Sequence, residues 1–302
     1  PIWGEARRRR VPLPTYPFER QRYFIEPGVA QAESEAALPA RIDDPARWGF
    51  RPLWVPEAAR VPCDVEGGDL GPAQTWLVFA DAAGLADACT ARLAAAGHRV
   101  VTVRAGDAFA RLSDTEYRLA PERGREGYDA LLHDLVARGL APARIAHFWL
   151  VTDGATFRPG SSFFHRNLEQ GFWSLFFLAQ AIGAENLPRP LHITAVTTGA
   201  AQVRGEGLAH PEKAALAGPA RVIPREFPGV TVTTLDVTLP PGRGRAAALA
   251  PLVLEDMLAE PGNAAAALRA GRRYAQVHRP VPLPDPAPAV PEGAAVLITG
   301  GF

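Results

Sequence analysis

The sequence predicts a doubly wound α/β fold, in which a mostly parallel sheet carries helices on both faces. Apolar segments with the length of buried strands occupy residues 74–80, 98–104, 145–151, 191–196 and 230–237. Segments with helical periodicity separate most of these strands. Strands that alternate with helices in this way pair in parallel and are covered on both sides.

The first 46 residues do not follow this pattern. Residues 1–27 contain an arginine run at 7–10, which we interpret as a solvated loop in preference to a nucleic-acid patch. Prolines exclude a helix in the part after this run, and its aromatic residues predict docking on a separate body: Pro12, Pro14, Pro17, Tyr16, Phe18, Tyr23 and Phe24. Residues 28–46 are small and acidic, as in a flexible connector, and a strand is expected within 48–55.

The predicted helices have recognisable ends. Helix 85–96 stops at Gly97, and helix 126–138 stops at Gly139. The latter carries four apolar residues that we expect on one buried face: Leu131, Leu132, Leu135 and Val136. Helix 211–226 should be interrupted by its two prolines, Pro219 and Pro224. Helix 245–259 and a short strand at 272–278 complete this part of the chain.

Helix 161–182 is unusually aromatic, with Phe163, Phe164, Phe172, Trp173, Phe176 and Phe177. These residues cover more than the single stripe that a surface helix needs. We therefore expect one face of this helix to pack on the sheet and another on a neighbouring element.

The last residues form the beginning of a second unit. A proline-rich connector, 280–291, leads to an apolar run at 294–298 that predicts a buried parallel strand. It ends in Thr299, Gly300 and Gly301, as a dinucleotide-binding unit does before its helix. The sequence stops at Phe302 and has no initiator methionine, so we expect a fragment.

The predicted sheet lacks the glycine turn that brings a backbone close to a phosphate. After the strand at 74–80 the sequence has Asp81 and a single glycine, Gly84, which argues against a cofactor. The match to G-x-G-x-x-A at 242–247 lies too far beyond its strand and is interpreted as the loop before a helix. In the loop 205–207, Glu206 would repel a pyrophosphate.

Catalytic motifs are also missing from the sequence. A short-chain reductase needs a tyrosine four residues before a lysine, but Ala209 precedes Lys213, the sole lysine. G-x-S-x-G and HExxH are absent, and His147 and His192 are expected as core or sheet-end residues. Asp153 either contacts a ligand or, as we favour, caps a turn. We therefore predict no catalytic residue and no metal site.

Charge and cysteine content exclude several classes of protein. The 32 basic residues balance the 32 acidic ones, which gives no reason to expect nucleic acid or a membrane as partner. Two cysteines are too few for a disulfide scaffold, and no apolar run reaches membrane-spanning length. A cytoplasmic location is expected.

The whole chain resembles the ketoreductase region of a modular type I polyketide synthase. Residues 11–24 (VPLPTYPFERQRYF) resemble the linker after the acyltransferase domain, and residues 51–54 (RPLW) resemble the entry strand of the ketoreductase. Residues 171–180, 211–228 and 269–274 are similar to signatures of its non-catalytic structural subdomain. Residues 299–301 match the first glycines of its catalytic subdomain.

The resemblance implies a truncated Rossmann-like structural subdomain at 47–293, after a linker at 1–27 and a connector at 28–46, with the catalytic subdomain opening at 294–302. It implies that Thr299, Gly300 and Gly301 contact NADPH in the parent reductase, which acts on the β-keto group of a carrier-bound intermediate. Its implied partners are the catalytic subdomain, acyltransferase, ketosynthase and acyl carrier protein of a homodimeric parent. The possibility that a dehydratase or methyltransferase is inserted between the two ketoreductase halves stays open. The alternatives are a scaffold whose reductase half is inactive and, less favoured, an independent nucleotide-dependent enzyme.

Overall fold

The computed structural model describes residues 42–153, 162–240, 245–283, 290 and 293–300. Two compact units are present: residues 49–281 form one, and residues 1–48 with 282–302 form the other. The predicted linker 1–27 and most of the connector 28–46 lie outside the described residues.

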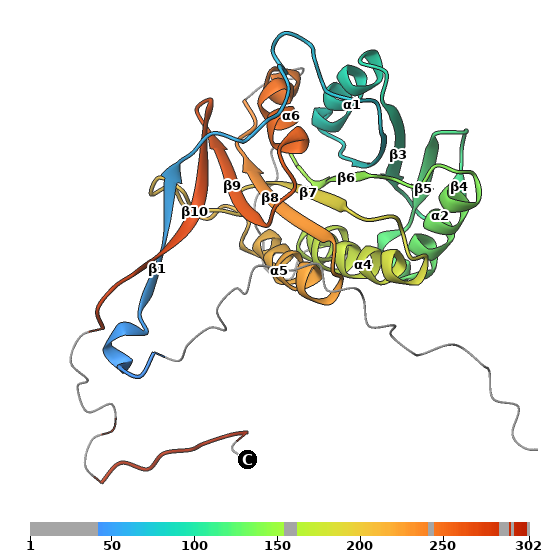
Figure 1. The fold of residues 1–302 in the computed structure, drawn as a ribbon. Helices are drawn as coiled ribbons and strands as arrows, with labels where there is room; N and C mark the ends of the chain where they lie inside the picture. Colours follow the sequence, from blue (N-terminus) through green and yellow to red (C-terminus); the bar gives the residue numbers. More distant parts are fainter. Residues whose placement is uncertain (1–41, 154–161, 241–244, 284–289, 291–292, 301–302) are drawn as a thin grey trace, which may run out of the picture. The chain divides into compact units, whose positions relative to one another are not determined.

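The larger unit is built on a ten-stranded sheet of order β1-β10-β9-β8-β7-β6-β2-β3-β5-β4 (Figure 1). The seven strands from β9 to β5 in this order pair in parallel, whereas β4, β10 and β1 join the edges antiparallel. The strands are β1 (Phe50–Pro56), β2 (Thr75–Ala80), β3 (Arg99–Ala105), β4 (Ala110–Arg111), β5 (Glu116–Leu119), β6 (Arg144–Leu150), β7 (Leu191–Thr198), β8 (Val230–Val237), β9 (Ala264–Arg269) and β10 (Arg272–Pro280).

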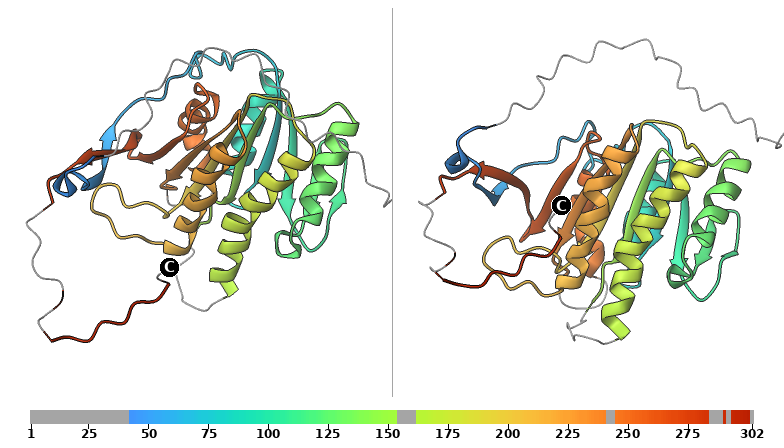
Figure 2. Two further views of the ribbon diagram at one scale, coloured as in Figure 1. Left: turned by 60° about the horizontal axis from the view of Figure 1, so that its bottom comes forward. Right: turned by 90° about the horizontal axis from the view of Figure 1, so that it is seen from below.

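Helices cover both faces of this sheet, and each face has its own core (Figure 2). On one face lie α2 (Glu126–Ala137), α3 (Ser162–Leu168), α4 (Ser174–Ala184) and α5 (Ala217–Glu226). On the other lie α1 (Leu85–Ala95) and α6 (Ala250–Leu258). The central strands are buried on both sides, since every residue of β7 is buried. The predicted mostly parallel α/β fold is therefore confirmed.

Most predicted elements occur where they were expected, and three strands were missed. The predicted strand ranges correspond to β1, β2, β3, β6, β7, β8 and β10. Short β4 and β5 and alanine-rich β9 carry too little apolar or β-branched sequence to predict a strand. Gly97 and Gly139 end their helices with φ of 88° and 66°, as expected. On α2 the prediction for Val136 was wrong, because its side chain is exposed.

The helix 161–182 is broken in a way that the sequence did not indicate. The described part consists of α3, a π turn called η3 (Glu169–Trp173), and α4. The segment 211–226 also differs from its prediction. A 3-10 helix, η4 (Pro211–Leu216), precedes α5, and both prolines lie inside α5 instead of breaking it. Pro219 falls in the first turn of α5, where its missing N–H has no intrahelical acceptor to lose.

The prediction of a buried strand at 294–298 was wrong. These residues have no regular secondary structure, and Leu297 and Ile298 are 90% and 77% exposed. A parallel strand needs a neighbouring strand for its backbone hydrogen bonds, and none of the described strands pairs with these residues.

Candidate functional site

The first strand–helix junction of the sheet holds an aspartate where a nucleotide-binding fold holds a phosphate. Asp81 follows β2, and α1 begins four residues later. Its carboxylate accepts hydrogen bonds from the backbone N–H groups of Leu85 (3.2 Å) and Ala86 (2.7 Å). These amides and the helix dipole are what a bound phosphate would use. Asp81 therefore fills the anion position of this helix with the protein's own charge.

Burial gives this aspartate an unusual environment. Its side chain is almost inaccessible to solvent, and burial raises its pKa although the backbone N–H groups act to lower it. The adjoining cleft of about 460 Å³ lies at the carboxyl ends of β2, β3 and β6, where open α/β sheets bind their ligands. Asp153 lines this cleft; the residue after it, Gly154, with which the expected turn would be formed, lies outside the described residues.

The loop 205–207, which contains two glycines, does not form a phosphate-binding site. Glu206 lies in it and accepts hydrogen bonds from the backbone N–H groups of Val203 (3.0 Å) and Arg204 (2.5 Å) and from Arg269 Nε (2.8 Å). Burial acts to raise the pKa of Glu206, but these hydrogen bonds dominate and lower it to about 2. An ionised carboxylate therefore occupies this loop. The second glycine match, 242–247, lies largely outside the described residues.

Lys213 is buried at the carboxyl ends of β6 and β7. Its ammonium donates hydrogen bonds to Thr152 Oγ1 (2.7 Å), to Thr198 Oγ1 (3.0 Å) and to the Thr198 carbonyl oxygen (3.0 Å). Burial lowers its pKa to about 8, partly opposed by the nearby charges of Glu212 and Asp236. All three N–H donors are used, so Lys213 joins two strand ends instead of activating a tyrosine.

The two strand histidines behave as expected of core residues. His147 is fully buried, and its Nε2 contacts Ser174 Oγ at 2.8 Å. His192 Nδ1 contacts Thr231 Oγ1 at 2.7 Å. Burial lowers the pKa of both to about 3, so both imidazoles are neutral at physiological pH. The described residues contain no group of three or more His, Cys, Asp or Glu side chains that could hold a metal ion.

The face of the helical layer that points away from the sheet carries an aromatic patch. We call Phe172, Trp173, Phe176, Phe177 and Val222 the aromatic face. Trp173, Phe176 and Val222 are 44%, 38% and 43% exposed. Ring centroids lie 5.8 Å apart in the stacked pair Trp173–Phe177 and 5.0 Å apart in the perpendicular pair Phe172–Trp173. Large apolar side chains gathered in this way on a surface mark an interaction site.

Two helices contribute to this patch. A Cβ on Gly218 of α5 would lie 3.6 Å from Phe172 Cε2, so the ring of Phe172 packs directly on α5. Val222 is one turn further along α5 on the same side as Gly218. The patch therefore extends from η3 and α4 to α5. The opposite side of α4 packs on the sheet through Leu175, Leu178 and Ile182, which are buried.

The π turn controls how these rings are presented. At Gly171, an added Cβ would lie 2.6 Å from Leu150 Cδ1 of β6, so η3 approaches the sheet as closely as a glycine permits. A π turn inserts one residue into a helix and rotates the residues after the insertion about the helix axis. After Gly171, Trp173 and Phe176 are exposed and Phe177 packs partly against the core, while the aliphatic residues of α4 are buried.

The cofactor contacts expected from the sequence are not part of any described cleft. Thr299 and Gly300 lie in the smaller unit without regular structure, and Gly300 has φ of 77°. Gly301 lies outside the described residues. Sequence reasoning also missed the buried role of Lys213, although a single lysine in a chain whose other basic residues are arginines was a usable signal.

No helix of the described part of the chain has the length and apolar character required to cross a bilayer.

Comparison with known proteins gives one family and many similar structures. The family described as beta-ketoacyl synthase-like, N-terminal, matches residues 74–252. A structure titled "Adenylation, ketoreductase, and pseudo Asub multidomain structure of a keto acid-selecting NRPS module" is 25% identical, with a TM-score of 0.65; the match covers 78% of this chain and 18% of that one.

Two further solved structures share the fold. An N-terminal ketoreductase from the macrolactin assembly line is 17% identical, with a TM-score of 0.59; the match covers 77% of this chain and 44% of that one. A C2-type ketoreductase from a modular polyketide synthase is 20% identical, with a TM-score of 0.50; the match covers 78% of this chain and 44% of that one. The chain therefore spans less than half the length of each of these structures.

Proposed function

We propose that this chain, which belongs to the beta-ketoacyl synthase-like N-terminal family, contains the structural subdomain of a ketoreductase in a modular polyketide synthase. In this proposal residues 47–293 bind no dinucleotide. They hold a second, catalytic subdomain that begins at residues 294–302. The likeness to ketoreductase structures supports this assignment.

Asp81 occupies the position at the N-terminus of α1 where a phosphate would bind. This supports the part of the proposal in which residues 47–293 bind no dinucleotide. A dinucleotide would have to displace the Asp81 carboxylate from the N-terminus of α1 and then lie next to that negative charge. Repulsion between an aspartate and a pyrophosphate in a partly buried site is strongly unfavourable. Lys213, which a reductase would use beside a tyrosine, has all its donors occupied and has Ala209 at the tyrosine position.

The aromatic face is the main observation behind the proposal that this chain binds and supports a catalytic subdomain. Trp173 and Phe176 remain partly exposed although each would contribute about 1.5–3 kcal/mol when fully buried. Aromatic residues at the centre of an interface are typical hot spots, with effects of about 2 kcal/mol or more. A rigid α4–α5 platform that already packs on the sheet can present them without a large ordering cost. We assign this face to the catalytic subdomain.

The finer assignments follow from the same proposal. The catalytic subdomain would bind NADPH, with Thr299, Gly300 and Gly301 at its first glycine turn, and would reduce the β-keto group of an intermediate on an acyl carrier protein. Residues 1–27 would lie against the acyltransferase and its ketosynthase linker in a homodimeric parent in the cytoplasm. The second candidate is a scaffold that binds an inactive reductase half, since the aromatic face serves either role.

Mixing experiments test the proposal. The chain is combined with a separately produced catalytic subdomain of its own synthase. Complex formation is measured by calorimetry, and NADPH oxidation is measured by absorbance with a β-ketoacyl thioester present as hydride acceptor. The double variant Trp173→Ser/Phe176→Ser should weaken the complex about a hundredfold, at about 1.4 kcal/mol per tenfold change. Leu112→Ser, at another exposed apolar residue (51%), serves as control.

Two outcomes would contradict parts of the proposal. Complex formation without NADPH oxidation favours the scaffold alternative. An unchanged affinity in the double variant, with an intact fold, would show that the aromatic face is not the interface.

A further inference from the structure

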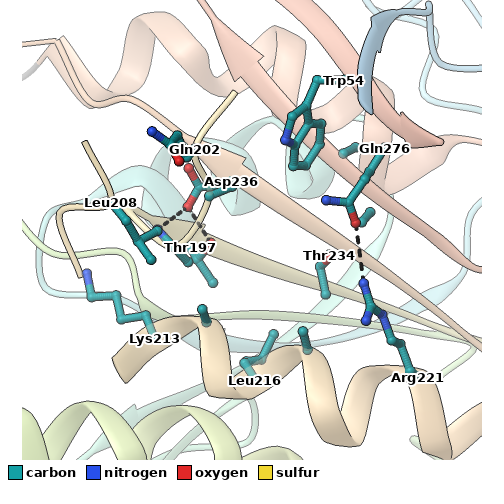
Figure 3. A pocket seen from close by; sticks show the side chains of 16 residues that line it. Trp54, Thr197, Gln202, Leu208, Lys213, Leu216, Arg221, Thr234, Asp236 and Gln276 are labelled. Carbon is teal, nitrogen blue, oxygen red and sulfur yellow. Dashed lines mark hydrogen bonds between the residues drawn. The ribbon is translucent and has the colours of Figure 1, made fainter. Parts of the chain in front are cut away.

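A cavity of about 290 Å³ lies against α5 (Figure 3). Gly218 and Val222 of α5 point to the aromatic face, whereas Ala217 and Arg221 line the cavity. Neighbouring residues on a helix project about 100° apart, so these two pairs occupy different sides of α5. The cavity is therefore independent of the surface assigned to the catalytic subdomain.

Small residues make this cavity hollow. The side chains of Ala265 of β9 and Thr234 of β8 form its floor, whereas the side chain of Ala266 belongs to the core on the other face of the sheet. Across a sheet face, residues of this size leave space that valine or leucine would fill. Trp54 of β1, the cross-strand partner of Gln276, forms an apolar wall on one side, and Leu208 in the loop after β7 forms an apolar wall on the far side (Figure 3). The space between these two walls suits a narrow apolar group.

The Asp236 carboxylate, which also lines the cavity, is fully engaged by protein donors. Asp236 Oδ1 accepts from Arg269 Nη2 at 2.5 Å. Asp236 Oδ2 accepts from Thr197 Oγ1 and from the backbone N–H of Ala200, both at 2.7 Å. Its charge is neutralised by Arg269, so it does not counter a negative ligand.

Arg221 and Gln276 meet on the side of the cavity where Trp54 lies, and both have unused N–H donors. Arg221 Nη2 of α5 donates to Gln276 Oε1 of β10 at 3.3 Å, which Figure 3 shows bridging the gap. No ion pair links Arg221 to a carboxylate among the residues the structure describes. An exposed guanidinium whose hydrogen bond is long and neutral gains more from a carboxylate, which it can bind with two parallel N–H groups.

Arg221 and Gln276 also border a second cavity. This second cavity has a volume of about 330 Å³ and continues along α5 from the first. Its far end is lined by Arg225 and His278. Arg221 thus lines both cavities. The first also contains Lys213 and Asp236, both of which are engaged by protein groups, and the charged lining of the second, within the described part of the chain, is basic.

We propose that this cavity binds a slender apolar molecule that ends in a carboxylate, of the class of medium-chain acyl carboxylates. The tail lies between Trp54 and Leu208 above Ala265. The carboxylate replaces the Oε1 atom of Gln276 as acceptor for Arg221 and also accepts from the Gln276 amide N–H. The volume is at the lower end of the range for small-molecule pockets, which excludes bulky ligands.

Calorimetric titration of the whole chain with octanoate tests the proposal, and octanol serves as the neutral ligand of equal length. We expect saturable octanoate binding with a Kd of about 0.1–1 mM, as suits so few atoms. Arg221→Gln should weaken this binding about tenfold or more by removing the charged donor. Ala265→Leu, which fills the floor, should abolish it. Arg92→Gln, at an exposed arginine of α1 on the other sheet face, should leave the Kd unchanged.

Several results would overturn the proposal. If the unaltered chain does not bind octanoate, or binds octanol with equal affinity, the cavity has no carboxylate-binding site. Equal weakening by Arg92→Gln and Arg221→Gln would indicate a general charge effect. Tight binding of an acidic peptide with no octanoate binding would mean that the groove is a protein-docking surface. None of these results bears on the aromatic face, so failure here is distinguishable from failure of the proposed function.

Discussion

Replacing Lys213 by methionine should change how the stability of this protein depends on pH. The ammonium is buried, with 1% of the residue exposed, and donates to Thr152 and Thr198 at the ends of β6 and β7. Methionine has a similar length but no titrating group and no donor. Because Lys213 is the sole lysine, no other lysine obscures its titration.

The size of the effect follows from the difference between the folded and unfolded pKa. Burial lowers the pKa of Lys213 from 10.5 to about 8, and this difference corresponds to about 3 kcal/mol. Between these two values the unfolded chain binds more protons than the folded one, so the free energy of unfolding rises with pH. Below pH 8 the buried charge imposes its full cost. From pH 7 to pH 10 the unaltered protein should gain about 2–3 kcal/mol relative to Lys213→Met.

Urea unfolding at pH 7, 8, 9 and 10 measures this difference, since urea does not screen charges. Tyrosines and cysteines titrate in both proteins and cancel in the comparison. In Lys213→Arg the side chain stays protonated through this range, so this control should show no such rise relative to Lys213→Met. A difference between unaltered protein and Lys213→Met that stays constant from pH 7 to 10 would refute the reasoning, because the folded pKa would then be that of an ordinary lysine.

Three further outcomes are expected. Asp81→Ala should lower the free energy of unfolding, measured in urea at pH 7, by about 0.5–2 kcal/mol, because two amides of the first turn of α1 lose their acceptor; no loss would mean that solvent serves them equally well. Gly171→Ala should cost about 1–3 kcal/mol through its contact with Leu150, whereas Gly207→Ala, whose Cβ meets nothing within 4 Å, should change stability by less than about 0.5 kcal/mol. Calorimetry of the chain with NADPH should show no saturable heat, and micromolar binding would contradict the structural-subdomain proposal.

Local sequence was sufficient for most of the α/β framework. Strands β2, β6, β7 and β8 are buried on both faces, so nearly every position must be apolar or small, and this leaves a signal that needs no tertiary information. Helix ends at Gly97 and Gly139 are equally local, because a left-handed residue favours glycine wherever it occurs. The obstacle to a phosphate at Asp81 also follows from position alone, one residue after a strand and four before a helix.

Tertiary structure decided the rest. Alanine-rich β9 is a strand because β8 and β10 pair with it, not because of its own propensity. The run 294–298 has strand propensity but no partner strand among the described residues, and it is exposed. The π turn depends on the contact of Gly171 with Leu150, two positions that only the folded chain brings together. Lys213 stands out in the sequence as the sole lysine, but only the fold shows where it lies: three oxygens at the ends of β6 and β7 converge on its buried ammonium. Strand pairing, close packing and desolvation act between residues that are distant in sequence. The periodicity of the sequence therefore cannot predict these interactions.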